Sequence, residues 1–228
     1  MAARMRGARF RKGFPLPELL ERLETEMRGW QVPALEMVAA KQGDPFRVLM
    51  GTVLSLRTRD ETTLPALGRL MALAGNPARL VAANVADLAN VIYPVAFYRV
   101  KARNLSAIGA ALLERHGGQV PDTLEALLEL PGVGRKTANH VLGLGFGEPA
   151  ICVDTHVHRI LNRLGALTSR DPDHTEQALR RHLPRDYWLK VNRVLVPFGQ
   201  ALCAPISPRC SQCPVTGYCR RVGVKRHR

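Results

Sequence analysis

The stretch LPGVGRKTANHVL, from Leu130 to Leu142, lies near the middle of the 228-residue chain. A short helical pattern over residues 124–130 leads into it, and an apolar helical pattern leads out of it. Between them stands Pro-Gly-Val-Gly, which favours a tight turn because glycine carries no Cβ. The sequence therefore predicts two helices joined by a hairpin, with Arg135 and Lys136 at the start of the second helix.

The hairpin offers a physical means of holding a phosphate group. Its two glycines let the backbone approach a ligand, and the amides that begin the next helix can bind a phosphate oxygen with help from the helix dipole. Such a contact positions a duplex but reads no base. The candidate DNA-binding residues of the hairpin are Leu130, Gly132, Val133, Gly134 and Arg135.

The charge of the chain points to the same class of partner. Its 33 lysines and arginines outnumber 19 acidic residues, for a net charge of +14 and a pI near 10.5. Such an excess favours polyanions, with nucleic acid first and an anionic membrane surface second. No apolar run approaches the roughly 18 residues that a membrane span needs. We therefore expect DNA as the partner and no membrane; a basic protein without such a partner is the plainer alternative.

Lysine is scarce in this chain, with six residues against 27 arginines. Arginine binds phosphates well but stays protonated, so it cannot act as an amine nucleophile. Lys136 lies in the first turn of the helix after the hairpin, where a neutral amine could form a Schiff base with a sugar aldehyde. The plainer alternative is that Lys136 is one more phosphate-binding lysine.

A carboxylate follows at Asp154, beyond the helix that Lys136 begins. Its position before Thr-His-Val-His fits the N-cap of a helix. It could also lie beside Lys136 and stabilise positive charge on a sugar ring or move a proton. His156 and His158 are two residues apart, so on a helix they point in different directions, which argues against a shared metal.

Four cysteines fall within 17 residues in the pattern C-x6-C-x2-C-x5-C, while Cys152 stands alone and is expected to be a small buried side chain. The Arg-rich start has no apolar core and does not predict a secretory leader, so the cluster indicates a reducing compartment and metal binding. Four thiolates can hold zinc or an iron–sulfur cluster, and the compact loop with a single C-x-x-C favours iron–sulfur. The candidate ligands are Cys203, Cys210, Cys213 and Cys219.

Helical periodicity runs through the rest of the chain, and no stretch shows the alternation of a strand. Capping residues followed by apolar runs indicate several helix starts, at Asp44, Asp60, Asn76, Asn84 and Asp122. We therefore expect an all-α fold. The expected helices cover residues 16–27, 45–54, 61–72, 77–81, 85–91, 97–116, 123–130, 136–146, a segment from 155, about 173–182 and 186–202.

Three motifs, LPGVGRKTA at 130–138, VDTHVHR at 153–159 and the cysteine loop, together resemble the bacterial endonuclease III family of helix–hairpin–helix DNA glycosylases. The resemblance runs from about Pro45 to Cys219. It implies a bifunctional DNA glycosylase and AP lyase of base excision repair that removes oxidised pyrimidines. By this resemblance Lys136 is the nucleophile that forms a Schiff base before β-elimination, Asp154 is the catalytic aspartate, and the four cysteines bind a [4Fe–4S] cluster.

The resemblance also implies an architecture. Two helical domains would flank a DNA-binding cleft: a six-helix barrel over residues 38–148, and a cluster domain made of residues 16–37 and 149–228. Residues 1–15 would form a basic flexible arm. The partner would be double-stranded DNA with damaged bases or abasic sites. We expect a monomer in the bacterial cytoplasm, associated with the nucleoid.

Two positions depart from the family pattern. Arg57 stands where relatives commonly have glutamine in a Leu-Ser-x-Gln stretch, and Phe97 stands where they often have leucine in Gly-Leu-Tyr. The resemblance implies that Arg57 fills the gap left by a flipped base and that Phe97 is the intercalating wedge. These departures leave the preferred lesion and opposite base open.

Two other functions remain as alternatives. A monofunctional glycosylase related to the adenine glycosylases would share the hairpin, aspartate and cluster but lack a lysine nucleophile. A non-catalytic DNA-binding module would use the hairpin and the cysteine loop structurally. The presence of both Lys136 and Asp154 favours the bifunctional enzyme over the non-catalytic module.

Overall fold

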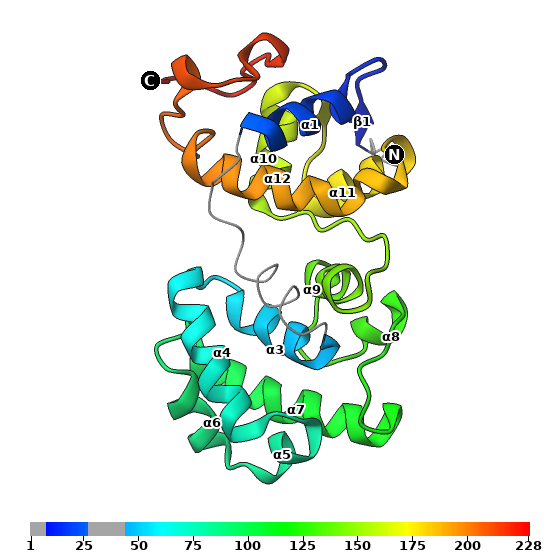
Figure 1. The fold of residues 1–228 in the computed structure, drawn as a ribbon, viewed down its shortest axis with the longest axis vertical. Coiled ribbons are helices and arrows are strands. Elements are labelled where there is room, and N and C mark those ends of the chain that lie inside the picture. Colours follow the sequence, from blue (N-terminus) through cyan, green and yellow to red (C-terminus); the bar gives the residue numbers. More distant parts are fainter. Residues whose placement is uncertain (1–7, 27–43) are drawn as a thin grey trace, which may run out of the picture. The chain divides into compact units, whose positions relative to one another are not determined.

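The computed structural model describes residues 8–26 and 44–228, in which nearly all the regular elements are helices (Figure 1). The all-α prediction is therefore confirmed. The described residues divide into two compact units, residues 44–150 and residues 8–26 with 151–228. The boundary predicted near residue 38 lies outside the described residues, so the predicted domain limits stay a prediction. No helix in the described ranges is long and apolar enough to cross a membrane.

Three of the early helices in the unit of residues 44–150 begin with a side-chain cap. Asp44, Asn76 and Asn84 each accept a hydrogen bond from a backbone amide of the following turn, as the sequence predicts. The helices of this unit are α3 (Pro45–Ser55), α4 (Asp60–Ala74), α5 (Pro77–Ala82), α6 (Val85–Ile92), α7 (Tyr98–His116), α8 (Leu124–Leu128) and α9 (Arg135–His140).

Two predicted caps in this unit are wrong. Asp60 is the first residue of α4 rather than the residue before it. The N-cap of α8 is Thr123, whose hydroxyl accepts the amide of Ala126 at 3.4 Å, so Asp122 does not cap this helix. Aspartate and threonine are both good N-caps, and with several such residues in a row the sequence alone does not single one out.

The prediction of one α-helix over residues 136–146 is also wrong in its second half. The α-helix ends at His140 and continues as a π-helical turn, Val141–Gly145. Gly145 lies so close to α3 that an added Cβ would be 3.1 Å from the Cα of Pro45. Gly145 thus permits close packing, in a wider turn than the periodicity indicates.

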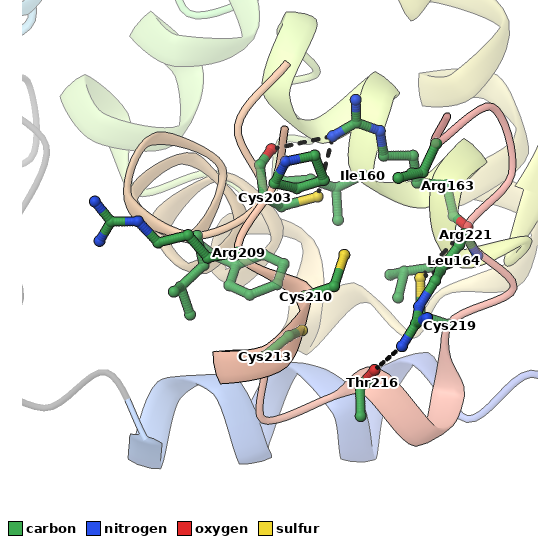
Figure 2. Close-up of a pocket in the computed structure, with 14 residues that line it drawn as sticks. Ile160, Arg163, Leu164, Cys203, Arg209, Cys210, Cys213, Thr216, Cys219 and Arg221 are labelled. Atoms are coloured by element: carbon green, nitrogen blue, oxygen red, sulfur yellow. Dashed lines mark hydrogen bonds between the residues drawn. The ribbon is translucent and has the colours of Figure 1, made fainter. Parts of the chain in front are cut away.

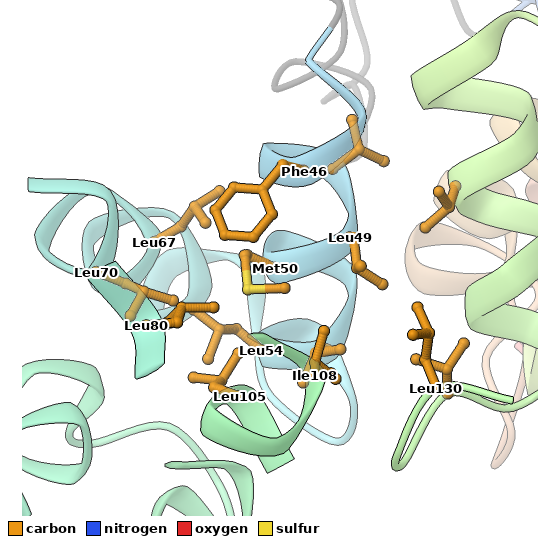
Figure 3. Packing of buried hydrophobic residues seen from close by; sticks show 14 of the residues in the cluster. Phe46, Leu49, Met50, Leu54, Leu67, Leu70, Leu80, Leu105, Ile108 and Leu130 are labelled. Carbon is orange, nitrogen blue, oxygen red and sulfur yellow. The ribbon is translucent and has the colours of Figure 1, made fainter. Parts of the chain in front are cut away.

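Helix α3 lies in the hydrophobic core of residues 44–150, as its apolar sequence predicts (Figure 3). Its leucines, methionine and phenylalanine are almost fully buried among side chains of α4 and α7. Full burial of one such side chain stabilises a fold by about 1.5–3 kcal/mol. The labelled members of this core include Phe46, Leu49, Met50, Leu54, Leu67, Leu70, Leu105 and Ile108.

The second unit contains α1 (Leu16–Glu26), which buries Leu16, Leu19, Leu20 and Leu23, and three further long helices. These helices are α10 (Thr155–Leu164), α11 (Pro172–His182) and α12 (Trp188–Ala201). Short 3-10 turns lie at Arg185–Tyr187, Cys210–Gln212 and Thr216–Tyr218. Cys152 lies shortly before α10 and is buried, as expected.

The prediction that residues 1–15 form a flexible arm is wrong from Arg9 onward. Residues 1–7 lie outside the described residues. Strand β1 (Arg9–Phe10) pairs antiparallel with β2 (Leu167–Thr168). Phe10 stacks on His182, and Phe14 is 5% exposed. Burial of Phe14 and stacking of the partly buried Phe10 thus hold this basic segment against its unit.

The predicted hairpin forms a tight turn in which the amide of Val133 donates to the carbonyl of Leu130 at 3.1 Å. Gly132 adopts a left-handed conformation with φ of +74°, and an added Cβ would lie 2.5 Å from Nδ2 of Asn104 on α7. Gly134 has an ordinary φ of −94° and open space around it. Only the first of the two glycines is therefore required by the turn itself.

We expect Gly132→Ala to lower the free energy of unfolding by at least about 1–2 kcal/mol, because the left-handed conformation alone costs an L-residue that much. Gly134→Ala is the matched control and should change stability much less. Chemical denaturation of both variants measures the difference. Equal stability of the two variants would contradict the turn geometry.

Candidate functional site

Lys136 is the second residue of α9, directly after the hairpin, and its side chain is partly exposed. The next three residues, Thr137, Ala138 and Asn139, are buried. They seat the helix in the core of its unit, so the backbone that carries Lys136 is firmly held. The structure thus places this lysine on a fixed helix start next to the hairpin, as the sequence predicts.

The other described lysines differ from Lys136 in their surroundings. Burial lowers the pKa of Lys101 to about 8, but its side chain is only 6% exposed and its ammonium binds three oxygens, so it cannot meet a sugar. Lys190 forms an ion pair with Glu24 at 2.8 Å. Lys136 is therefore preferred to Lys101 and Lys190 as the nucleophile.

Asp154 is the N-cap of α10, as its sequence context predicts. Its Oδ1 accepts the amides of His156 at 2.8 Å and of Val157 at 2.9 Å. The preceding residue, Val153, is 6% exposed. Two hydrogen bonds and a buried neighbour fix the carboxylate at the start of a helix, where the helix dipole favours negative charge.

The two histidines after Asp154 face different partners. His156 Nδ1 lies 3.1 Å from Nη2 of Arg159, whereas His158 Nδ1 lies 2.7 Å from Oγ1 of Thr175. Burial lowers the pKa of His158. Both rings are engaged in contacts within their own unit, as expected of residues two apart on a helix.

Lys136 and Asp154 belong to different units of the chain, residues 44–150 and residues 8–26 with 151–228. Each residue is fixed within its own unit by the contacts just described. A common active site of the two is therefore part of the function proposed below.

The structure brings together Arg57 and Phe97, which lie in segments distant in sequence. The guanidinium carbon of Arg57 lies 5.3 Å from the centre of the Phe97 ring, in a cation–π contact. Both residues are exposed, and both have left-handed backbones, with φ of 57° and 58°. Such a conformation costs a non-glycine residue about 1–2 kcal/mol and is typical of functional segments.

The four clustered cysteines line a single pocket in the unit that contains α10 and α12 (Figure 2). Burial, with the nearby thiolate charges adding to it, raises the pKa of Cys213 and of Cys219. Two donors reach the sulfurs: Nη1 of Arg163 lies 3.6 Å from Cys203 Sγ, and the amide of Arg221 lies 3.3 Å from Cys219 Sγ.

The chemistry of this pocket fits a thiolate-bound metal group. Its lining contains four thiols, several apolar side chains and the arginines 163, 209 and 221, with no carboxylate or imidazole. Soft thiolates suit iron–sulfur clusters or zinc, and the arginines would offset their negative charge. In the described part of the chain, no three Cys, His, Asp or Glu side chains stand close enough to hold a metal ion as they are.

The sequence interpretation missed two residues that support the cysteine loop. Arg159 donates through Nη2 to the carbonyls of Gly199 and Cys203, at 3.1 and 2.9 Å. Arg163 donates to the carbonyls of Ala204 and Pro205, both at 2.6 Å. The two arginines are four residues apart on α10 and so lie on one face of the helix. This spacing is the sequence feature from which their shared role could have been predicted.

The chain was next compared with known protein families, sequences and solved structures. Residues 50–185 match the family model described as HhH-GPD superfamily base excision DNA repair protein. Endonuclease III of Thermotoga maritima is 50% identical over 179 residues, which cover 78% of this chain and 84% of that protein. Endonuclease III homolog 2, chloroplastic, of Arabidopsis thaliana is 40% identical over 183 residues, which cover 76% of this chain but only 47% of the plant protein.

Among solved structures, a non-covalent endonuclease III–DNA complex superposes with a TM-score of 0.81 at 31% identity. The match covers 90% of this chain and 94% of that one. The family model, the sequence relatives and the solved structure therefore all indicate the same family. This chain belongs to the HhH-GPD superfamily of base excision DNA repair proteins and, within it, to the endonuclease III family.

Proposed function

We propose that this base excision repair DNA glycosylase is bifunctional, removing oxidised pyrimidines from duplex DNA and then cutting the strand as an AP lyase. The observation that carries the proposal is Lys136, an amine on a fixed helix start immediately after a glycine hairpin. Identity of 50% to an endonuclease III adds to it. A solved structure of a trapped endonuclease III–DNA covalent intermediate, whose protein is 31% identical to this chain, supports covalent chemistry in the family.

In the proposed reaction the neutral Nζ of Lys136 attacks C1′ of the damaged nucleotide. The N-glycosidic bond breaks, its electron pair leaves with the base, and opening of the sugar ring yields a Schiff base. Loss of a C2′ proton then breaks the 3′ C–O bond by β-elimination. Asp154 would stabilise positive charge on the sugar and carry protons between steps.

The DNA backbone would be held by the hairpin. Gly132 and Gly134 are exposed, and Arg135 is partly exposed, so their backbone and guanidinium can approach a phosphate. The side chains of Leu130 and Val133 are 2% and 6% exposed. These two residues can therefore contribute to DNA binding only through their backbone.

The exposed pair of Arg57 and Phe97 would act on the base stack. We propose that Phe97 enters the duplex as a wedge and that Arg57 fills the space of the flipped base. A wedge must be apolar and accessible, and Phe97 is 59% exposed. The lesion and opposite-base preferences would follow from the shape and charge of this pair.

A [4Fe–4S] cluster is proposed at the pocket of Cys203, Cys210, Cys213 and Cys219. When bound, it would join the four cysteines through iron–sulfur bonds and so hold the loop of residues 203–219 in place. The soft donor set and the surrounding arginines support this assignment. We also propose that the protein acts as a monomer in the bacterial cytoplasm, associated with the nucleoid and without a membrane partner.

Borohydride reduction during reaction with abasic DNA should trap a covalent complex with the wild-type protein. Lys136→Gln should lower trapping by about 10³-fold or more, because the amine that forms the Schiff base is then absent. The control is Lys225→Gln, an exposed lysine near the end of the chain, which should trap fully. Base release without any trapping by the wild type would favour a monofunctional enzyme.

Replacement of Asp154 separates its cap role from its chemistry. Asparagine is also a good N-cap, so Asp154→Asn should keep wild-type stability, whereas Asp154→Ala should lose about 1 kcal/mol. Both variants should release oxidised bases about 10²–10⁴-fold more slowly in single-turnover assays, because both lack the carboxylate. Normal base release by the asparagine variant would leave Asp154 with the cap role alone.

Purified protein should be yellow-brown and contain iron and sulfide in about a 1:1 ratio, as a cubane cluster requires. Cys213→Ser should lose the iron, and Cys152→Ser, which alters the buried cysteine outside the loop, should keep it. Because burial raises the pKa of Cys213 and of Cys219, protons compete with the metal, so chelators should extract iron faster as the pH falls. Stoichiometric zinc in place of iron would overturn the assignment.

A further inference from the structure

Lys101 on α7 is a buried charged residue that the proposed reaction does not use. Its Nζ donates to the carbonyls of Leu54 and Leu56, at 2.8 and 2.6 Å, and to Oγ1 of Thr58 at 3.3 Å. An ammonium has three protons, so these three acceptors satisfy it. All three belong to the segment in which α3 ends, and that segment includes Arg57.

The same helix start also determines the position of Phe97. The backbone amide of Lys101 donates to the carbonyl of Phe97 at 3.0 Å. The amide of Ala96 donates to Oγ1 of Thr58 at 3.2 Å, which joins the segment before Phe97 to the segment after α3. Lys101 and Thr58 therefore connect the two segments that carry Arg57 and Phe97.

This arrangement is costly, which indicates a purpose beyond filling space. Burial lowers the pKa of Lys101 to about 8, so the charged ammonium is disfavoured where it stands. An apolar side chain of similar length would avoid that penalty. The left-handed backbones of Arg57 and Phe97 are also unfavourable and must be held by their surroundings.

We propose that Lys101 is a positioning residue that, together with Thr58, holds Arg57 and Phe97 as one preformed pair before DNA is bound. The inference rests on the proposed function, in which these two side chains enter the duplex. A preformed pair avoids the loss of side-chain and loop freedom that would otherwise oppose binding. Without the contacts of Lys101 and Thr58, the side chains of Arg57 and Phe97 would still be exposed but would no longer have one fixed geometry.

The test uses full-length protein and a duplex that carries a tetrahydrofuran abasic analogue opposite 2-aminopurine, whose fluorescence rises when it is unstacked. Thr58→Val removes the hydroxyl at nearly constant shape, and Thr58→Ser restores it. We expect the valine variant to lose most of the fluorescence rise and to bind about tenfold more weakly, since two side chains must then be ordered on binding. The serine variant should behave as wild type.

Lys101→Met should lose the fluorescence rise and the affinity to the same extent as Thr58→Val. If the methionine variant does not fold, the comparison of Thr58→Val with Thr58→Ser tests the inference by itself. Leu112→Ala is the control for stability, because Leu112 is buried on α7 far along the helix from Lys101. It should lower the melting temperature yet keep the full fluorescence rise. Equal loss of fluorescence by Leu112→Ala, or none by Thr58→Val, would overturn the inference.

The assay also separates this inference from the proposed chemistry. The abasic analogue cannot form a Schiff base, so failure of Lys136 as the nucleophile would leave the fluorescence result intact. Phe97→Ala should abolish the fluorescence rise on the same duplex. If it does not, Phe97 does not act on the base stack and Lys101 has no pair to position, whatever the trapping experiment gives.

Discussion

The close contact between Gly132 and Asn104 is the constraint on which the unit of residues 44–150 depends. Gly132 has a φ of +74°, and an added Cβ would lie 2.5 Å from the side-chain nitrogen of Asn104 on α7, so a larger residue would be strained and would displace that side chain. The hairpin is thereby fixed against α7. The same helix begins directly after Phe97 and carries Lys101 one turn later, so a single helix contacts both the hairpin and the segments that carry the exposed pair of Arg57 and Phe97.

Both residues proposed to react stand at helix starts, and this position has a physical use. Lys136 follows a hairpin whose apolar side chains are buried, and Asp154 is held by two backbone amides. A helix start fixes the backbone while leaving the side chain at the surface of its unit. The buried residues that follow supply the stability, so reactive groups need not contribute to the core.

Much of the fold could be predicted because its signals are local. The caps at Asp44, Asn76, Asn84 and Asp154 are read from a few neighbouring residues, and the structure has all four. The docking of β1 and the π-helical turn before Phe146 depend on partners distant in sequence, and periodicity carries no sign of them. The cysteine spacing could be recognised for the same local reason, whereas the arginines that support the loop act across about 40 positions.

The two departures from the family pattern are best understood as one change. Each was visible in the sequence, but their contact was not, because it joins segments far apart along the chain. An arginine gains a cation–π contact only where an aromatic ring is within reach, and leucine would offer none. Arg57 and Phe97 therefore support each other, and the buried ammonium of Lys101 lies behind both segments. In this chain the surface that would meet the base stack is a charged and aromatic pair whose geometry is set from inside the protein.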